Sequence, residues 1–139
     1  MKKIRVFVYG TLRKGLTFGD ALDRAELLGN GETKDKFGFF HYRYPAALIM
    51  SSDVHIKGEL YLVDAETLKD LDAIEGHPEF YRRRPVYIRM EDGTETNAYM
   101  YFLVLGEDEA EKQGIKIESG DFIKFYKNYF NQEPSVLRR

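Results

Sequence analysis

Residues 4–15 constrain the fold of this chain more than any other stretch. Every second residue from position 4 to position 8 is β-branched, as in a strand with one apolar face. The strand runs directly into Gly10, and the loop that follows ends at Gly15. Glycine at a strand end allows backbone N–H groups to turn toward a bound anion or oxyanion. The chain therefore begins with a strand and a candidate binding loop.

Further strands are predicted along the chain. Residues 55–63 alternate between apolar and polar positions, and residues 84–91 and 95–104 flank Asp92-Gly93, which is a strong hairpin signal. Two less regular extended segments are also expected, residues 32–44, which Pro45 interrupts, and the apolar run 46–50.

The predicted helices are short. Asp64 is expected to cap a helix that runs to about Glu75 and that Gly76 ends. Residues 19–28 form another short helix with Asp20 as a candidate cap, and Gly29-Asn30-Gly31 breaks it. Five or more strands with two or three short helices predict an α+β domain. Three C-terminal features complete the prediction: an acidic loop or short helix at 106–114, a helical packing stripe of Phe122, Tyr126, Tyr129 and Phe130, and a loose tail at 135–139.

Composition narrows the class of protein. The 139 residues, 43% hydrophobic and 32% charged, predict a single globular domain over residues 1–139. A net charge of −2 gives no general attraction to nucleic acid or membranes. The absence of cysteine excludes disulfides, thiol catalysis and thiolate metal sites, and it fits a cytoplasmic protein. No membrane span or signal peptide is expected.

The glycine loop is close to a phosphate-binding pattern but does not complete it. Residues 10–17 nearly follow G-x-x-x-x-G-K-[ST], but Leu16 stands where the lysine would reach the phosphates. The strand–helix alternation of a parallel sheet is also missing. A P-loop is therefore excluded, and a tight turn between a strand and a helix remains an alternative for this segment.

Glu75 is the most unusual carboxylate in the sequence. Helical spacing places it on the same face as Leu68 and Leu71, in the middle of an apolar stripe. Burial and the helix C-terminus both favour a raised pKa, so this carboxyl is a candidate general base and general acid near neutral pH. The alternatives are that Glu75 extends from a frayed last turn, or that it pairs with an arginine of residues 82–84.

Other catalytic or ligand-binding patterns are weak. His41, His55 and His77 show no metal-ligand spacing, so no metal is expected. The serines lack an obvious nucleophile elbow. Nothing singles out Asp72 or Glu79 as a second catalytic carboxylate. The arginines at 82–84 alternate between strand faces and do not form one nucleic-acid surface.

Two motifs together resemble the gamma-glutamyl cyclotransferase-like (AIG2-like) family, and most closely its gamma-glutamylamine cyclotransferase branch. Residues 9–13, Tyr-Gly-Thr-Leu-Arg, resemble the branch's Y-G-T-L loop. Residues 75–83, Glu-Gly-His-Pro-Glu-Phe-Tyr-Arg-Arg, resemble its E-G-x-P-x-x-Y-x-R segment. Residues 119–122, Ser-Gly-Asp-Phe, are similar to a late S-G-D-aromatic segment of the family. The resemblance spans nearly the whole chain.

The resemblance implies a small mixed or antiparallel β-barrel with short peripheral helices. It implies an enzyme that releases an amine from a small gamma-glutamyl compound while the glutamyl part closes to 5-oxoproline. No metal or cofactor is implied, and the leaving amine and the oligomeric state stay open. By position, Glu75 is the proton acceptor, and the substrate-binding residues are Tyr9, Gly10, Thr11, Leu12 and, beside Glu75, Tyr81.

The chain departs from the family pattern at two places. Phe18-Gly19 stands where many relatives carry Asn-His, which leaves the substrate open more than the chemistry. Phe122 stands where relatives often have tryptophan. Two other functions therefore remain: a non-catalytic small-molecule-binding or regulatory domain that retains the pocket, and a purely structural interaction protein.

Overall fold

A closed five-stranded barrel forms the larger part of the computed structural model, which describes residues 2–16 and 19–130. Neighbouring strands are antiparallel, except that β1 and β7 run parallel, with Val6 opposite Tyr99. This mixed barrel with peripheral helices confirms the predicted α+β fold. The strands follow the order β1 (Ile4–Val8), β5 (Lys57–Val63), β2 (Glu26–Thr33), β6 (Tyr81–Met90) and β7 (Glu95–Leu103).

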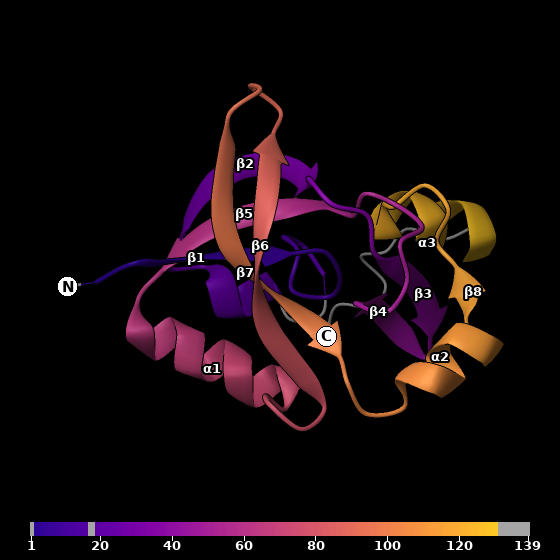
Figure 1. Ribbon diagram of the computed structural model, residues 1–139. Helices are drawn as coiled ribbons and strands as arrows, with labels where there is room; N and C mark the ends of the chain where they lie inside the picture. The colour runs from indigo at the N-terminus through magenta and orange to yellow at the C-terminus, as the bar shows by residue number, and fades with distance from the viewer. Residues whose placement is uncertain (1, 17–18, 131–139) are drawn as a thin grey trace.

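A second, three-stranded antiparallel sheet lies beside the barrel (Figure 1). Its order is β4 (Tyr44–Leu48), β3 (Gly38–Tyr42) and β8 (Ile115–Lys116). Figure 1 shows α2 (Glu107–Gln113) and α3 (Phe122–Phe130) around this sheet, and α1 (Ala65–Glu75) below the barrel. Among the described residues, no helix has the length and apolar character to cross a membrane.

Local sequence signals account for the ends of α1. The Asp64 carboxylate accepts a hydrogen bond from the Thr67 amide at 2.8 Å, which satisfies one of the unpaired donors of the first turn. Gly76 closes the helix in the left-handed conformation, with φ of 65°, which glycine adopts without a steric cost. The predicted helix from Asp64 to Glu75 is therefore confirmed at both ends.

The predicted β6–β7 hairpin is also confirmed. Gly93 has φ of 89° in its turn, and the Met90 amide donates to the Thr94 carbonyl at 2.8 Å. Strand β6 starts at Tyr81, three residues earlier than the sequence indicates. The acidic segment forms the short helix α2, one of the two predicted alternatives.

The predicted helix over residues 19–28 is wrong. Only a single 3-10 turn, η1 (Gly19–Leu22), is present, and the chain then enters β2. The glycines expected to break a helix instead lie inside this strand, which bulges between Leu27 and Gly29 as it pairs with β5. Pairing with two barrel strands outweighs the weak local helix preference of this segment.

Two other irregular segments resolve into defined strands. The extended segment 32–44 divides into the end of β2 and strand β3, and Arg43, at φ of 66°, turns the chain into β4. Pro45 lies within β4 at the edge of its sheet, where a missing N–H is tolerated.

The aromatic stripe of α3 packs only in part. Phe122 and Tyr126 are buried, whereas Tyr129 and Phe130 are exposed, although the Tyr126 and Phe130 rings lie 4.7 Å apart between centroids. The loose tail expected at 135–139, like Phe18, lies outside the described residues.

The buried side chains form two adjoining hydrophobic clusters. One includes Leu68 and Leu71 of α1, packed with Tyr81 and Tyr101 of the barrel. Leu71 is completely buried, so the apolar stripe predicted for this helix does face the core. The last residue of that stripe, Glu75, is therefore placed at the edge of this cluster.

Candidate active site

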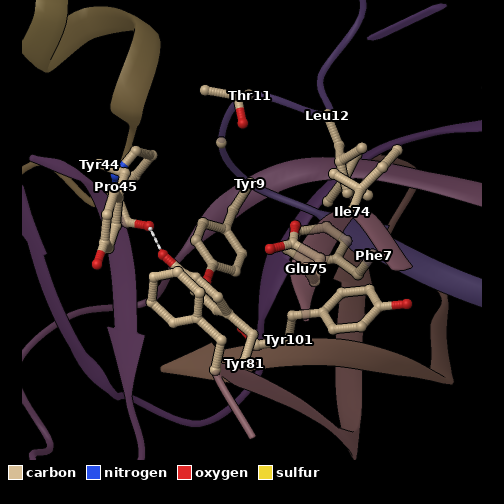
Figure 2. Close-up of a pocket in the computed structure, with 13 residues that line it drawn as sticks. Phe7, Tyr9, Thr11, Leu12, Tyr44, Pro45, Ile74, Glu75, Tyr81 and Tyr101 are labelled. Carbon is tan, nitrogen blue, oxygen red and sulfur yellow. Dashed lines mark hydrogen bonds between the residues drawn. The ribbon is translucent and has the colours of Figure 1, made fainter. Parts of the chain in front are cut away.

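A cavity of about 200 Å³ lies where the end of β1, the end of α1 and the start of β6 meet. Figure 2 shows the carboxylate of Glu75 directed toward the ring of Tyr9 in this cavity. The cavity is enclosed mainly by aromatic and aliphatic side chains. The residues that line it are Phe7, Val8, Tyr9, Gly10, Thr11, Leu12, Tyr44, Pro45, Ile74, Glu75, Phe80, Tyr81 and Tyr101.

Glu75 is the only ionisable carboxylate among these lining residues. It ends α1, and its half-buried side chain faces the cavity (Figure 2). The last helical turn is not frayed, because the Gly76 amide bonds to the Ala73 carbonyl and the His77 amide to the Asp72 carbonyl. No cation forms a salt bridge with Glu75 among the described residues. Neither alternative considered from the sequence, a frayed turn or an arginine pair, is therefore present.

Burial raises the pKa of Glu75 from 4.5 to about 7. The ionised carboxylate of Glu75 loses hydration in the apolar wall, and no cation among the described residues forms an ion pair that would compensate for this loss. A carboxyl group with this pKa is present in both protonation states near neutral pH. It can therefore both accept and return a proton there.

The loop after β1 approaches the second sheet so closely that only glycine fits at position 10. A Cβ atom at Gly10 would lie 2.7 Å from Cγ of Pro45. The loop then turns through hydrogen bonds from the Arg13 amide to the Gly10 carbonyl and from the Leu16 amide to the Arg13 carbonyl. Among the described residues, no acceptor is bonded to the amides of Thr11 and Leu12, which lie at the cavity wall.

Arg13 fixes this loop to two other elements through a side chain that does not line the cavity. Its buried guanidinium lies between Glu59 of β5, at 3.3 Å, and Asp121 at the start of α3, at 3.1 Å. The Glu59 carboxylate also accepts from the Lys14 amide at 2.9 Å. The Ser-Gly-Asp-Phe segment therefore contributes Asp121 to the support of the loop. Fixing the loop on two other elements presets the direction of its free amides.

Four tyrosines line the cavity, and the hydroxyls of three of them, Tyr9, Tyr81 and Tyr101, are hydrogen-bonded within the protein. Tyr9 donates to the Tyr101 carbonyl at 2.7 Å and accepts from the Ala47 amide at 3.2 Å. Tyr81 donates to the Pro45 carbonyl at 2.8 Å, as Figure 2 shows. Burial raises the pKa values of Tyr9, Tyr81 and Tyr101, so all three stay neutral. They therefore offer ring surfaces rather than mobile protons.

All six residues predicted from the sequence to form the site line this one cavity. The sequence analysis missed seven other lining residues, because the elements that carry them come together only in the folded chain. A weak signal existed for Phe80, which lies inside the second motif. These missed residues are Phe7, Val8, Tyr44, Pro45, Ile74, Phe80 and Tyr101.

The structure distinguishes the two acids that the sequence could not rank. Asp72 is bound by the guanidinium of Arg83 and the hydroxyl of Tyr101, whereas Glu79 is exposed. Neither lines the cavity. Within the described part of the chain, no group of three or more His, Asp or Glu side chains is arranged to hold a metal ion.

Comparison with known proteins gives a consistent assignment. Residues 6–124 match the family model described as "Gamma-glutamyl cyclotransferase, AIG2-like". A Methanocaldococcus jannaschii protein named "Putative gamma-glutamylcyclotransferase" is 41% identical over 125 residues, which cover 89% of this chain and 96% of that protein. The rat gamma-glutamylaminecyclotransferase is 26% identical, with coverage of 96% and 93%.

A solved structure agrees with these sequence relatives. The crystal structure of an AIG2-like protein from Mus musculus superposes with a TM-score of 0.74 and 25% identity, covering 85% of this chain and 88% of that one. Because identity is higher to the archaeal protein than to the rat enzyme, the predicted assignment to the amine branch is not specifically supported.

Proposed function

The chain belongs to the AIG2-like gamma-glutamyl cyclotransferase family, and we propose that it converts a small gamma-glutamyl amide to a free amine and 5-oxoproline. The observation that supports this most strongly is the position of Glu75. A carboxyl group with a pKa of about 7 faces a cavity that Thr11 and Leu12 also line, and the amides of these two residues bond to no acceptor among the described residues. The match over residues 6–124 also supports a single domain of this family.

In the proposed reaction, the α-amine of the glutamyl group attacks the carbonyl carbon of its own side-chain amide. The amine is protonated at neutral pH and cannot attack until it loses a proton. Ionised Glu75 accepts that proton, and the new C–N bond closes the five-membered ring. Protonated Glu75 then donates the proton to the leaving nitrogen as the old C–N bond breaks. The ring nitrogen loses its second proton to the released amine, which leaves as an ammonium ion. The protons therefore balance, and Glu75 returns to its ionised form.

The loop supplies the complementary interactions. The amides of Thr11 and Leu12 are suited to hold the α-carboxylate of the glutamyl group or the oxyanion that forms on the attacked carbonyl. One such donor contributes about 3 kcal/mol of transition-state stabilisation in sites of this kind. Because the reacting groups belong to one molecule, holding the substrate in its folded conformation supplies much of the remaining rate enhancement.

The cavity favours a short substrate with an uncharged or cationic leaving amine. Its volume of about 200 Å³ is below the range of roughly 300–1,000 Å³ typical of pockets for larger ligands. None of its described lining residues is Lys, Arg or His, so a carboxylate on the leaving group would have no cationic partner. We therefore place the substrate among gamma-glutamylamines rather than gamma-glutamyl amino acids.

The test is to incubate the purified protein with a gamma-glutamyl alkylamine and with a gamma-glutamyl amino acid, and to measure 5-oxoproline. We expect turnover of both classes to require Glu75, with the amine preferred by roughly tenfold or more in kcat/KM. The Glu75→Gln variant should lose at least about a hundredfold in kcat. Glu79→Gln is the matched control, because the same substitution is made at an exposed residue outside the cavity.

The outcomes separate the proposed enzyme from a binding domain. Thermal stabilisation by these compounds without 5-oxoproline would identify a non-catalytic domain that keeps the pocket. Full activity in Glu75→Gln would reject the mechanism. Equal or greater activity on the amino acid conjugate would reject the assigned leaving group while leaving the reaction intact.

A further inference from the structure

The carboxylate of Asp72 lies near the site but takes no part in the proposed reaction. It lies on α1, three residues before Glu75. Its Oδ1 accepts from Nε of Arg83 at 2.9 Å, and its Oδ2 accepts from Nη2 of Arg83 at 3.1 Å. The hydroxyl of Tyr101 donates to Oδ1 at 2.7 Å. Asp72 therefore joins the helix that carries Glu75 to both β6 and β7.

The contact with Tyr101 extends to the opposite wall of the cavity. The Tyr101 ring lines the cavity, and its backbone carbonyl accepts the hydrogen bond from Tyr9. The carboxylate of Glu75 is directed toward the ring of Tyr9 (Figure 2). Two hydrogen bonds thus connect Asp72 and Tyr9 to the same residue, one at the hydroxyl of Tyr101 and one at its backbone carbonyl, and they fix the two walls relative to each other.

Asp72 also balances the charge of Arg83, which it binds three residues before Glu75 on the same helix. Residues three apart on a helix are neighbours on its surface, with Cβ atoms about 5–6 Å apart. Burial tends to raise the pKa of Asp72, but the hydrogen bonds from Arg83 and Tyr101 and the guanidinium charge hold it below its usual range. Ionised Asp72 and Arg83 therefore form a pair with no net charge, and the opposite effects of the two charges on Glu75 largely cancel.

We propose that Asp72 is a positioning residue for Glu75: it fixes the end of α1 against the Tyr101 wall and cancels the charge of Arg83 beside the site. The relevance of this arrangement to catalysis rests on the proposed function. Its effect on Glu75 itself can be measured without any substrate.

The titratable groups around the two acids come from several elements. Glu75 shares its cavity with four tyrosine side chains, which stay neutral because burial raises their pKa values. Asp72, unlike Glu75, has a charged neighbour, which is the guanidinium of Arg83. The titratable groups that line the cavity with Glu75 are Tyr9 after β1, Tyr44 of β4, Tyr81 of β6 and Tyr101 of β7. Those that face Asp72 are Arg83 of β6, Tyr101 of β7 and His77 after α1.

The experiment is to titrate Glu75 by ¹³C NMR of the full chain labelled at the glutamate carboxyl carbon, with Glu75→Gln assigning the resonance. In Asp72→Asn the guanidinium of Arg83 is unbalanced, so the titration midpoint of Glu75 should fall by about one pH unit. By Coulomb's law, a unit charge at a separation of about 10 Å shifts a titration midpoint by about one pH unit when the effective dielectric constant is about 20. In Arg83→Met the unbalanced carboxylate should raise the midpoint by a similar amount.

Two further variants make the test specific. The double variant Asp72→Asn/Arg83→Met should return the midpoint close to the wild-type value, since neither charge remains. Asp70→Asn is the control, because it removes an exposed carboxylate from the same helix. A loss of packing alone would not shift the midpoint in opposite directions. Far-UV circular dichroism verifies that each variant is folded, and Arg83→Met still tests the proposal if Asp72→Asn is unfolded.

Kinetics then connect the arrangement to turnover. In Asp72→Asn, kcat should fall by about tenfold while KM changes less than about threefold, because the substrate-binding loop is untouched. Midpoints of Glu75 that stay unchanged, or that move in the same direction in the two single variants, would overturn the proposal. Opposite NMR shifts in a protein that forms no 5-oxoproline would support the positioning of Glu75 and reject only the proposed function.

Discussion

The difference in unfolding free energy between the Glu75→Gln variant and the wild type should depend on pH. It should move in favour of the variant as the pH rises from acidic to alkaline values. The carboxyl of Glu75 has a pKa of about 7 in the folded protein and 4.5 as its ordinary value. Between these two values the folded state holds a proton that the unfolded state has released. The free energy of unfolding of the wild type therefore decreases as the pH rises through this window.

The size of the effect follows from the same two values. Each pKa unit corresponds to about 1.4 kcal/mol, so the full cost of ionising Glu75 in the folded protein is about 3 kcal/mol. The cost is absent well below pH 4.5 and complete above about pH 7. Glutamine does not ionise in this range, so the Glu75→Gln variant escapes the cost. The difference in unfolding free energy between variant and wild type should therefore change by about 2–3 kcal/mol between about pH 5 and pH 8.

The assay is urea denaturation at several pH values, followed by far-UV circular dichroism and by tyrosine fluorescence. The chain has ten tyrosines and no tryptophan, so tyrosine emission is not masked. Glu79→Gln serves as the control, since it removes an exposed carboxylate by the same substitution. Subtracting the control leaves the contribution that depends on the burial of Glu75.

A pH-independent difference between Glu75→Gln and the wild type would refute the reasoning, because it would mean that Glu75 is hydrated as in the unfolded chain. A difference that grows toward acidic pH would be equally contradictory. It would show that the folded protein stabilises the ionised carboxylate.

Three further substitutions test how the site is built. In Gly10→Ala the new methyl group would collide with Pro45, so the urea midpoint should fall by an amount equivalent to about 1–3 kcal/mol, and KM should rise. Arg13→Met leaves two carboxylates without their buried cation and should cost about 3–5 kcal/mol in the same assay, whereas exposed Lys14→Met should not. Tyr81→Phe leaves the Pro45 carbonyl without its donor and should cost about 1–3 kcal/mol. Unchanged urea midpoints would contradict each of these expectations.

Those parts of the fold with strong local signals could be predicted from the sequence. Asp64 and Gly76 mark the ends of α1, and Asp92-Gly93 marks the hairpin, because capping and turn geometry depend on a few neighbouring residues. Helical phase alone also placed Glu75 on the apolar face of α1 that the structure buries. The pairing of the two motifs then indicated the family.

The parts that depend on distant residues could not be predicted. Strand β2 contains Gly29 and Gly31 and reads locally as a broken helix, yet it is held by pairing with β5 and β6. Tyr101 reaches the cavity only because the barrel closes between β7 and β1. The hydrogen bonds that fix Asp72 join residues far apart in the chain, and no periodicity in the sequence reports them.

The initial rate of 5-oxoproline formation from a gamma-glutamylamine, measured from about pH 5 to pH 9, tests the central claim most directly. If ionised Glu75 accepts the proton, kcat/KM should rise tenfold per pH unit below a midpoint near the pKa of about 7 and should level above it. The Glu75→Gln variant should show almost no turnover at any pH. Two results would contradict the assignment of Glu75 as the proton carrier. One is a pH profile in which kcat/KM does not rise below this midpoint, and the other is a Glu75→Gln variant that follows the wild-type profile at comparable rates.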